Sequence, residues 1–69
     1  MVEVFKTDVR EISQAEKLLR LLSAYFPQSK INFDLEDCDK ILRIDSHTNI
    51  SDDAIFALRR QGFKCEELE

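Results

Sequence analysis

Four short stretches of the chain alternate apolar and polar residues with a period of two, which predicts β-strands. They cover residues 2–5, 30–36, 40–45 and 63–67. The polar sequence EDCD at 36–39 joins the second stretch to the third. Because aspartate side chains accept hydrogen bonds from nearby backbone N–H groups in turns, we expect these two strands to form a hairpin with EDCD as its turn.

The alternation also assigns a face to each strand residue, because successive side chains point to opposite sides of a sheet. We expect Val2 and Val4 to face the core, which leaves Phe5 beside Glu3 on the open side of the sheet. Ile41 falls on the same open side in the neighbouring strand, so Phe5 and Ile41 are expected to form a cross-strand pair. The other strand residues expected to face the core are Ile31, Phe33, Leu35, Leu42, Ile44, Phe63 and Cys65.

Apolar residues between the first two strands recur at spacings of three and four, the period of a helix packed against a core. Two capping boxes, Ser13–Glu16 and Asp8–Glu11, predict starting points that differ by about one turn. Pro27 predicts the end of this helix at about Phe26, because the residue before a proline disfavours the helical conformation. The residues of this helix expected to face the core are Ala15, Leu18, Leu22 and Tyr25.

A second helix is predicted from about residue 52 to 61. Ser51 is its expected N-cap, since a serine hydroxyl can accept a hydrogen bond from a backbone N–H group of the first turn. Gly62 predicts a left-handed residue that stops the helix, after which Phe63 is expected to fold back toward Leu58.

The predicted order of elements is therefore strand, helix, strand, strand, helix, strand. For a single domain spanning residues 1–69, this order predicts an α+β fold, the ferredoxin-like βαββαβ sandwich. Its four-stranded antiparallel sheet is expected to have the spatial order 4-1-3-2, with both helices on one face.

Composition excludes several classes of function. Ten Lys and Arg against fourteen Asp and Glu make the chain net acidic, which argues against binding to the nucleic-acid backbone. No apolar run approaches the roughly 20 residues of a membrane-spanning helix, so no membrane partner is expected. Two cysteines are too few for a disulfide scaffold, and no apolar signal segment opens the chain. We therefore expect a cytoplasmic protein with reduced thiols.

The segments INFDLEDCDKILRID (31–45) and ISDDAIFALRRQGFKCEEL (50–68) resemble the second half of a heavy-metal-associated domain. That family comprises copper chaperones and small modules of metal-transporting ATPases. The likeness is carried by the FDL run at 33–35 and by the end of the second helix, LRRQGF at 58–63. The first strand and helix match the family in architecture, so the resemblance covers nearly the whole chain, mostly through packing positions.

The metal site of that family lies in the loop before the first helix, as Met-x-Cys-x-x-Cys, because two thiolates from one loop suit Cu(I). Matching the helix spacing places Val9 at the methionine, and Glu11 and Gln14 at the two cysteines. A carboxylate and an amide do not ligate a soft ion. The resemblance therefore implies the fold without the metal site, and we expect neither a metal nor another cofactor.

The remaining thiols and the histidine are not expected to rebuild a site. Cys38 and Cys65 are predicted at one end of the sheet but on opposite edge strands, about 14 Å apart at ~4.8 Å per strand. Cys38 is an exposed turn residue and a weak alternative metal ligand, whereas Cys65 belongs to the core. A calcium loop is excluded because Asp39 stands where that loop requires glycine. His47 follows the third strand, too far from Cys38 for a catalytic pair, so no catalytic residue is expected.

Phe56 lies about 100° away from the core line of its helix and is expected to be exposed. Together with Phe5 and Ile41 it forms the predicted interaction surface, for a protein partner or for a second copy of the chain. We therefore expect a small binding module that is not an enzyme. Two alternatives stay open: a metal-trafficking protein that uses Cys38 with a partner's thiols, and a regulatory module that binds small molecules.

Overall fold

The computed structural model describes residues 1–68, and its six elements follow the predicted order. They are β1 (Val2–Thr7), α1 (Ile12–Tyr25), β2 (Lys30–Asp34), β3 (Ile41–Asp45), α2 (Ser51–Arg60) and β4 (Cys65–Leu68). The predicted ends of the strands and of α2 agree with these bounds to within two residues.

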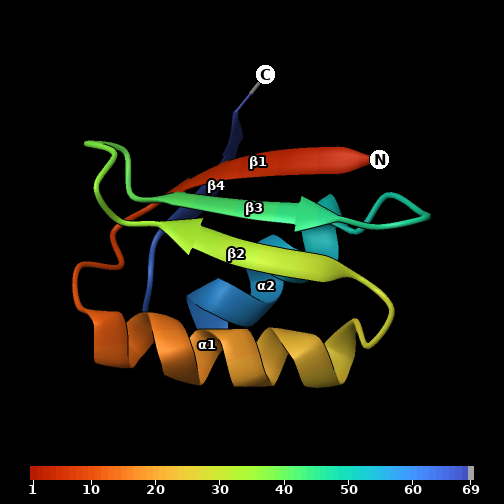
Figure 1. Cartoon of the computed structure of the whole chain (residues 1–69), viewed down its shortest axis with the longest axis horizontal. Coiled ribbons are helices and arrows are strands. Elements are labelled where there is room, and N and C mark those ends of the chain that lie inside the picture. Colours follow the sequence, from red (N-terminus) through yellow and green to blue (C-terminus); the bar gives the residue numbers. More distant parts are fainter. Residues whose placement is uncertain (69) are drawn as a thin grey trace.

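The four strands form one antiparallel sheet with the order β2-β3-β1-β4. Counted from the β4 edge, the same neighbours read 4-1-3-2. Both helices lie on one side of the sheet (Figure 1). This α+β arrangement is compatible with a small ferredoxin-like fold. It brings the loop before α1, the β2–β3 turn and the start of β4 to the same end of the molecule (Figure 1).

The start of α1 differs from both predicted starts, because its N-cap is Glu11 rather than Ser13 or Asp8. The carboxamide oxygen of Gln14 accepts hydrogen bonds from the backbone N–H groups of Glu11 (3.3 Å) and Arg10 (3.4 Å). A glutamine three residues after the N-cap can thus accept the hydrogen bond of the N-cap backbone N–H, as the glutamate of a capping box does. Gln14 therefore selects a start between the two expected ones.

Tyr25 is 59% exposed, so the prediction that it faces the core is wrong. Tyr25 and Phe26 follow Leu22 by three and four residues, and both spacings lie on the side of the helix that carries Leu22. Phe26 is half-buried and packs against the core, and its backbone N–H donates to the Leu22 carbonyl (2.8 Å). The apolar ring of Phe26 therefore packs against the core, whereas Tyr25, whose hydroxyl needs a polar partner, stays exposed.

The first turn of α2 also differs from the expectation, since Ser51 is the first helical residue and Ile50 is the N-cap. The Asn49 side-chain oxygen accepts a hydrogen bond from the backbone N–H of Ser51 (2.9 Å). Because Asn49 makes this contact at the helix start, the serine hydroxyl is free for other contacts. The predicted end of α2 is confirmed. Gly62 has a φ of 88°, and the Phe63 N–H donates to the Leu58 carbonyl (3.1 Å), as in a Schellman motif.

The two faces of β1 are the reverse of the prediction. Phe5 is completely buried in the core opposite Leu42, whereas Val2 is 61% exposed. Because side chains alternate along a strand, β1 must bury either its valines or the set Glu3, Phe5 and Thr7. The aromatic ring removes more apolar surface from water than a valine does. Glu3 is buried with it, and the hydroxyl group of Ser51 donates a hydrogen bond to its carboxylate.

Ile41 lies on the open side of the sheet as predicted, opposite Lys6 of β1 and Asp34 of β2. It is nevertheless only 5% exposed, so it adds no apolar surface for a partner. Its expected pairing with Phe5 is wrong, because the two side chains point to opposite sides of the sheet. The predicted sheet-face interaction surface is therefore absent from the described residues.

The hydrophobic core lies between the sheet and the two helices. Leu42 and Ile44 are completely buried as predicted, and Val9 in the loop before α1 is completely buried as well. The apolar residues of β2 are only partly buried and pack against this core from an edge strand. Among residues 1–68, no helix has the length and apolar character needed to cross a membrane.

Candidate functional site

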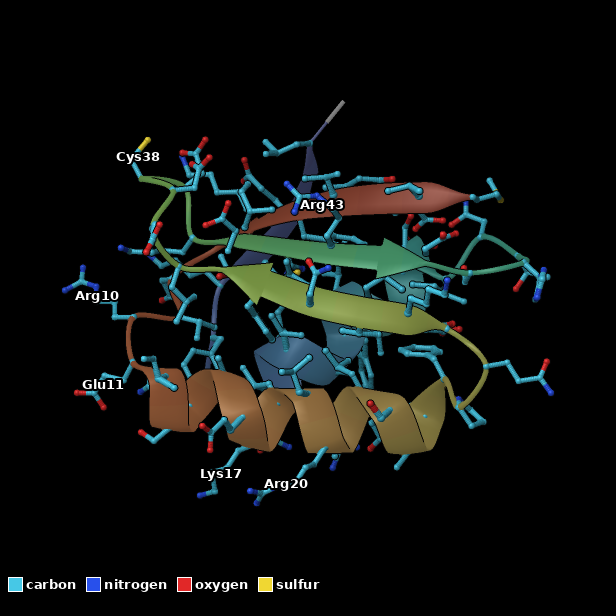
Figure 2. All side chains as sticks on the ribbon, viewed as in Figure 1. Arg10, Glu11, Lys17, Arg20, Cys38 and Arg43 are labelled. Atoms are coloured by element: carbon cyan, nitrogen blue, oxygen red, sulfur yellow. The ribbon has the colours of Figure 1, made fainter. Side chains whose placement is uncertain are left out.

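The loop before α1, where the resemblance places a metal site, is occupied by residues that shape the helix start. Val9 is buried in the core, and the side-chain oxygen of Gln14 accepts hydrogen bonds from two backbone N–H groups. Glu11 is exposed and points away from the molecule (Figure 2). These side chains supply no soft ligand.

The β2–β3 turn contains the one group of three metal-ligating side chains found among residues 1–68: Asp37, Cys38 and Asp39, with ligand atoms within 4.8 Å of one another. The carboxylates of this turn already have structural roles. The Asp37 carboxylate accepts a hydrogen bond from the backbone N–H of Asp39 (2.9 Å), and Asp39 forms an ion pair with Lys6 (3.7 Å). Such Asx interactions explain aspartates at a hairpin tip without a bound ion.

The two cysteines are free and differ in environment. Cys38 is exposed and points outward from the hairpin tip (Figure 2). Cys65 is 3% exposed, and its burial raises the pKa of the thiol to about 12, an effect that Arg59 partly offsets. Cys65 begins the edge strand β4, whereas Cys38 lies in the turn that joins the other edge strand, β2, to β3. A thiol held neutral by burial is a poor nucleophile and a poor metal ligand.

A buried carboxylate was not predicted as a site residue. Glu3 is 6% exposed, and the Ser51 hydroxyl that donates to its Oε2 atom also lies 3.0 Å from Oε2 of Glu67. The Oε1 atom of Glu3 is buried and has no hydrogen-bond partner among the described residues. The pair sits at the first turn of α2, where the helix dipole stabilises negative charge and opposes a bound cation. We therefore interpret Glu3 and Glu67 as a structural link between β1, α2 and β4. Sequence reasoning missed this link because it placed Glu3 on the open side.

Exposed aromatic residues gather instead where the end of α1 meets α2. They line a hollow of about 310 Å³, here called the aromatic hollow, formed by Tyr25, Phe26, Asp53, Phe56, Ala57 and Arg60. Phe56 is 62% exposed, which confirms that prediction, and Tyr25 is 59% exposed. Tyr25 packs edge-on against Phe26, with ring centroids 6.3 Å apart. The Arg60 guanidinium lies 5.7 Å from the centre of the Phe56 ring.

Charged groups flank the aromatic hollow on α2. Asp53 lies in the first turn and Arg60 in the last, and neither forms an ion pair within residues 1–68. Phe56 lies between them along the helix. The pattern of exposed apolar positions was sufficient to find Phe56. Tyr25 was missed because helical periodicity alone does not show which of two adjacent aromatic residues the core accepts.

Comparison of the chain with models of protein families, with curated proteins and with solved structures found no match.

Proposed function

We propose that this chain is a small cytoplasmic protein-binding module, not an enzyme, whose fold is that of a heavy-metal-associated domain without the metal site. The observation that carries the proposal is the exposure of two large aromatic side chains, Phe56 and Tyr25, in one hollow. Neighbouring exposed apolar side chains often mark an interaction site, and tyrosine and arginine are enriched among the residues that dominate the binding energy of interfaces.

The packing within the aromatic hollow further supports a binding role. Tyr25 packs edge-on against Phe26, and Arg60 lies over the ring of Phe56. Side chains that are ordered before binding lose less conformational entropy when a partner arrives. The hollow therefore combines apolar area, a cation and an anion on a partly preorganised surface.

Photo-cross-linking in the cells that make the protein tests this proposal. A benzophenone amino acid replaces Phe56 or Tyr25 in the full chain, and Ile12, which is 71% exposed outside the hollow, serves as the matched control. We expect discrete protein adducts from positions 56 and 25 that are absent from position 12. Equal labelling from all three positions, or no adduct from position 56, would refute the proposal.

A further inference from the structure

We propose that the aromatic hollow binds the same hollow of a second copy of this chain, in a two-fold dimer with antiparallel α2 helices. This inference rests on the proposed function and identifies the partner of the binding module as a second copy of the same chain. The surface that carries it is a stripe of α2 formed by the exposed residues Asp53, Phe56 and Arg60 together with Ala57, which is largely buried but lines the hollow.

The spacing of this stripe suits a helix pair. Phe56, Ala57 and Arg60 follow Asp53 by three, four and seven residues, so all four lie on one side of α2. The stripe extends over two turns, a length of about 10 Å at 1.5 Å per residue. In an antiparallel pair centred between Phe56 and Ala57, Asp53 of each copy meets Arg60 of the other. The same two-fold axis places each Phe56 ring against Ala57 of the other copy.

Charge complementarity identifies a second copy as the partner. A two-fold interface uses the same patch on both molecules, so the patch must complement itself. The stripe meets this condition, because an acid and a base that form no ion pair within residues 1–68 stand symmetrically about its aromatic centre. The antiparallel arrangement also places the acidic first turn of each α2 beside the basic last turn of the other, and opposes the two helix dipoles.

The local balance of charge matters because the whole chain has a net charge of −4. Two copies therefore repel each other weakly at long range. Within the stripe one negative and one positive side chain cancel, so this face allows close approach. The hollow of about 310 Å³ beside Phe56 leaves room for a ring. Ala57, which is largely buried, lines it together with Tyr25 and Phe26.

Charge reversal across the two-fold axis tests this inference. Sedimentation equilibrium of the reduced full chain over a wide concentration range is expected to show a monomer–dimer equilibrium. Asp53→Arg and Arg60→Asp each place two like-charged contacts in the dimer, and each is expected to weaken association roughly tenfold or more. The double variant D53R/R60D restores both contacts, so its association constant is expected to return to within about threefold of the wild type.

Asp52→Arg is the matched control, because it makes the same change in the first turn of α2 but lies outside the hollow. It is expected to leave association unchanged. Phe56→Ser, at a 62% exposed position, is expected to fold normally and to weaken the dimer. Circular dichroism melts of every variant verify folding before the sedimentation data are compared.

The inference is overturned if the wild type sediments as a monomer at all concentrations, if Asp52→Arg weakens association as much as Asp53→Arg, or if the double variant does not recover. A monomeric wild type that still cross-links to a different protein from position 56 removes the second-copy inference and leaves the proposed function standing. The absence of any adduct from position 56, including an adduct with the chain itself, removes both.

Discussion

The Ser51 hydroxyl donates a hydrogen bond to the buried carboxylate of Glu3, joining residues 48 positions apart in the chain. Through this bond the first turn of α2 is held against the central strand β1. It is also the only hydrogen bond that the Glu3 side chain forms among the described residues, since its other oxygen has no partner.

Removal of the Ser51 hydroxyl is expected to destabilise the fold because it leaves a buried carboxylate without any partner. Ser51→Ala should lower the free energy of unfolding by about 1–3 kcal/mol, measured by urea denaturation. The control is a double-mutant cycle with Glu3→Leu. Once Glu3 is apolar, loss of the hydroxyl should cost little, and strictly additive effects of the two substitutions would contradict the role assigned to this bond.

Truncation of β1 side chains tests which face of the strand is buried. Phe5→Ala should lower the free energy of unfolding by roughly 3–5 kcal/mol, because the ring is completely buried. Val2→Ala, at a 61% exposed position of the same strand, should change it by less than about 0.5 kcal/mol. The opposite ranking in chemical denaturation would support the face assignment predicted from the alternation.

Titration of Cys65 is expected to weaken the fold only in alkaline solution. Burial raises the pKa of its thiol from 9.0 to about 12 in the folded chain. Well below pH 9 the thiol is neutral in both states and adds no pH dependence. Between pH 9 and 12 the unfolded chain loses this proton first, so the free energy of unfolding should fall as pH rises.

The contribution of Cys65 is isolated by comparison with Cys65→Ala. The difference in unfolding free energy between the wild type and this variant should be constant well below pH 9 and should shrink as the pH rises through 9 toward 12. Parallel curves across the alkaline range would show that the folded state does not disfavour the thiolate.

Substitution of Gly62 tests the end of α2. Apart from its own residue and its two chain neighbours, a Cβ atom at this position would meet no heavy atom of residues 1–68 within 4 Å, so Gly62→Ala introduces backbone strain without a clash. The residue has a φ of 88°, and we expect a loss of about 1–2 kcal/mol in unfolding free energy, measured by thermal or urea denaturation. An unchanged stability would mean that the left-handed residue is not needed to stop the helix.

Metal binding is expected to be weak and independent of Cys38. Its neighbours in the turn are carboxylates, and soft ions such as Cu(I) prefer several thiolates. Titration of the reduced protein with Cu(I) against a competing chelator should give the same result for the wild type and for Cys38→Ser. A clear loss of affinity in the variant would instead favour the metal-trafficking alternative.

The sequence was sufficient where a local pattern and the tertiary packing favour the same outcome. The end of α2 is such a case, because Gly62 and the following Phe63 specify a capping motif through the backbone and one nearby apolar contact. The alternation of β3 likewise identified Leu42 and Ile44, since a central strand has one apolar face and one polar face. The hairpin tip at 36–39 followed from turn chemistry alone.

Local patterns failed where two arrangements were locally equivalent. In β1, the valines on one face and Phe5 on the other both fit a half-buried strand. At the end of α1, both Tyr25 and Phe26 were compatible with the core side. For this reason the predicted sheet-face pair of Phe5 and Ile41 was wrong. Phe56 was assigned correctly, because its position along α2 points it away from the core.

Sequence alone therefore determined the order of elements, the helix and hairpin ends set by Pro27, EDCD and Gly62, and the exposure of Phe56. These features depend on backbone preferences and on periodicity within a few residues. Only the tertiary structure decided which face of β1 is buried, that Glu3 meets Ser51, and that Tyr25 joins Phe56 in one hollow. Those outcomes depend on competition for space in a single small core, where burying one large ring decides the position of every other side chain on its strand.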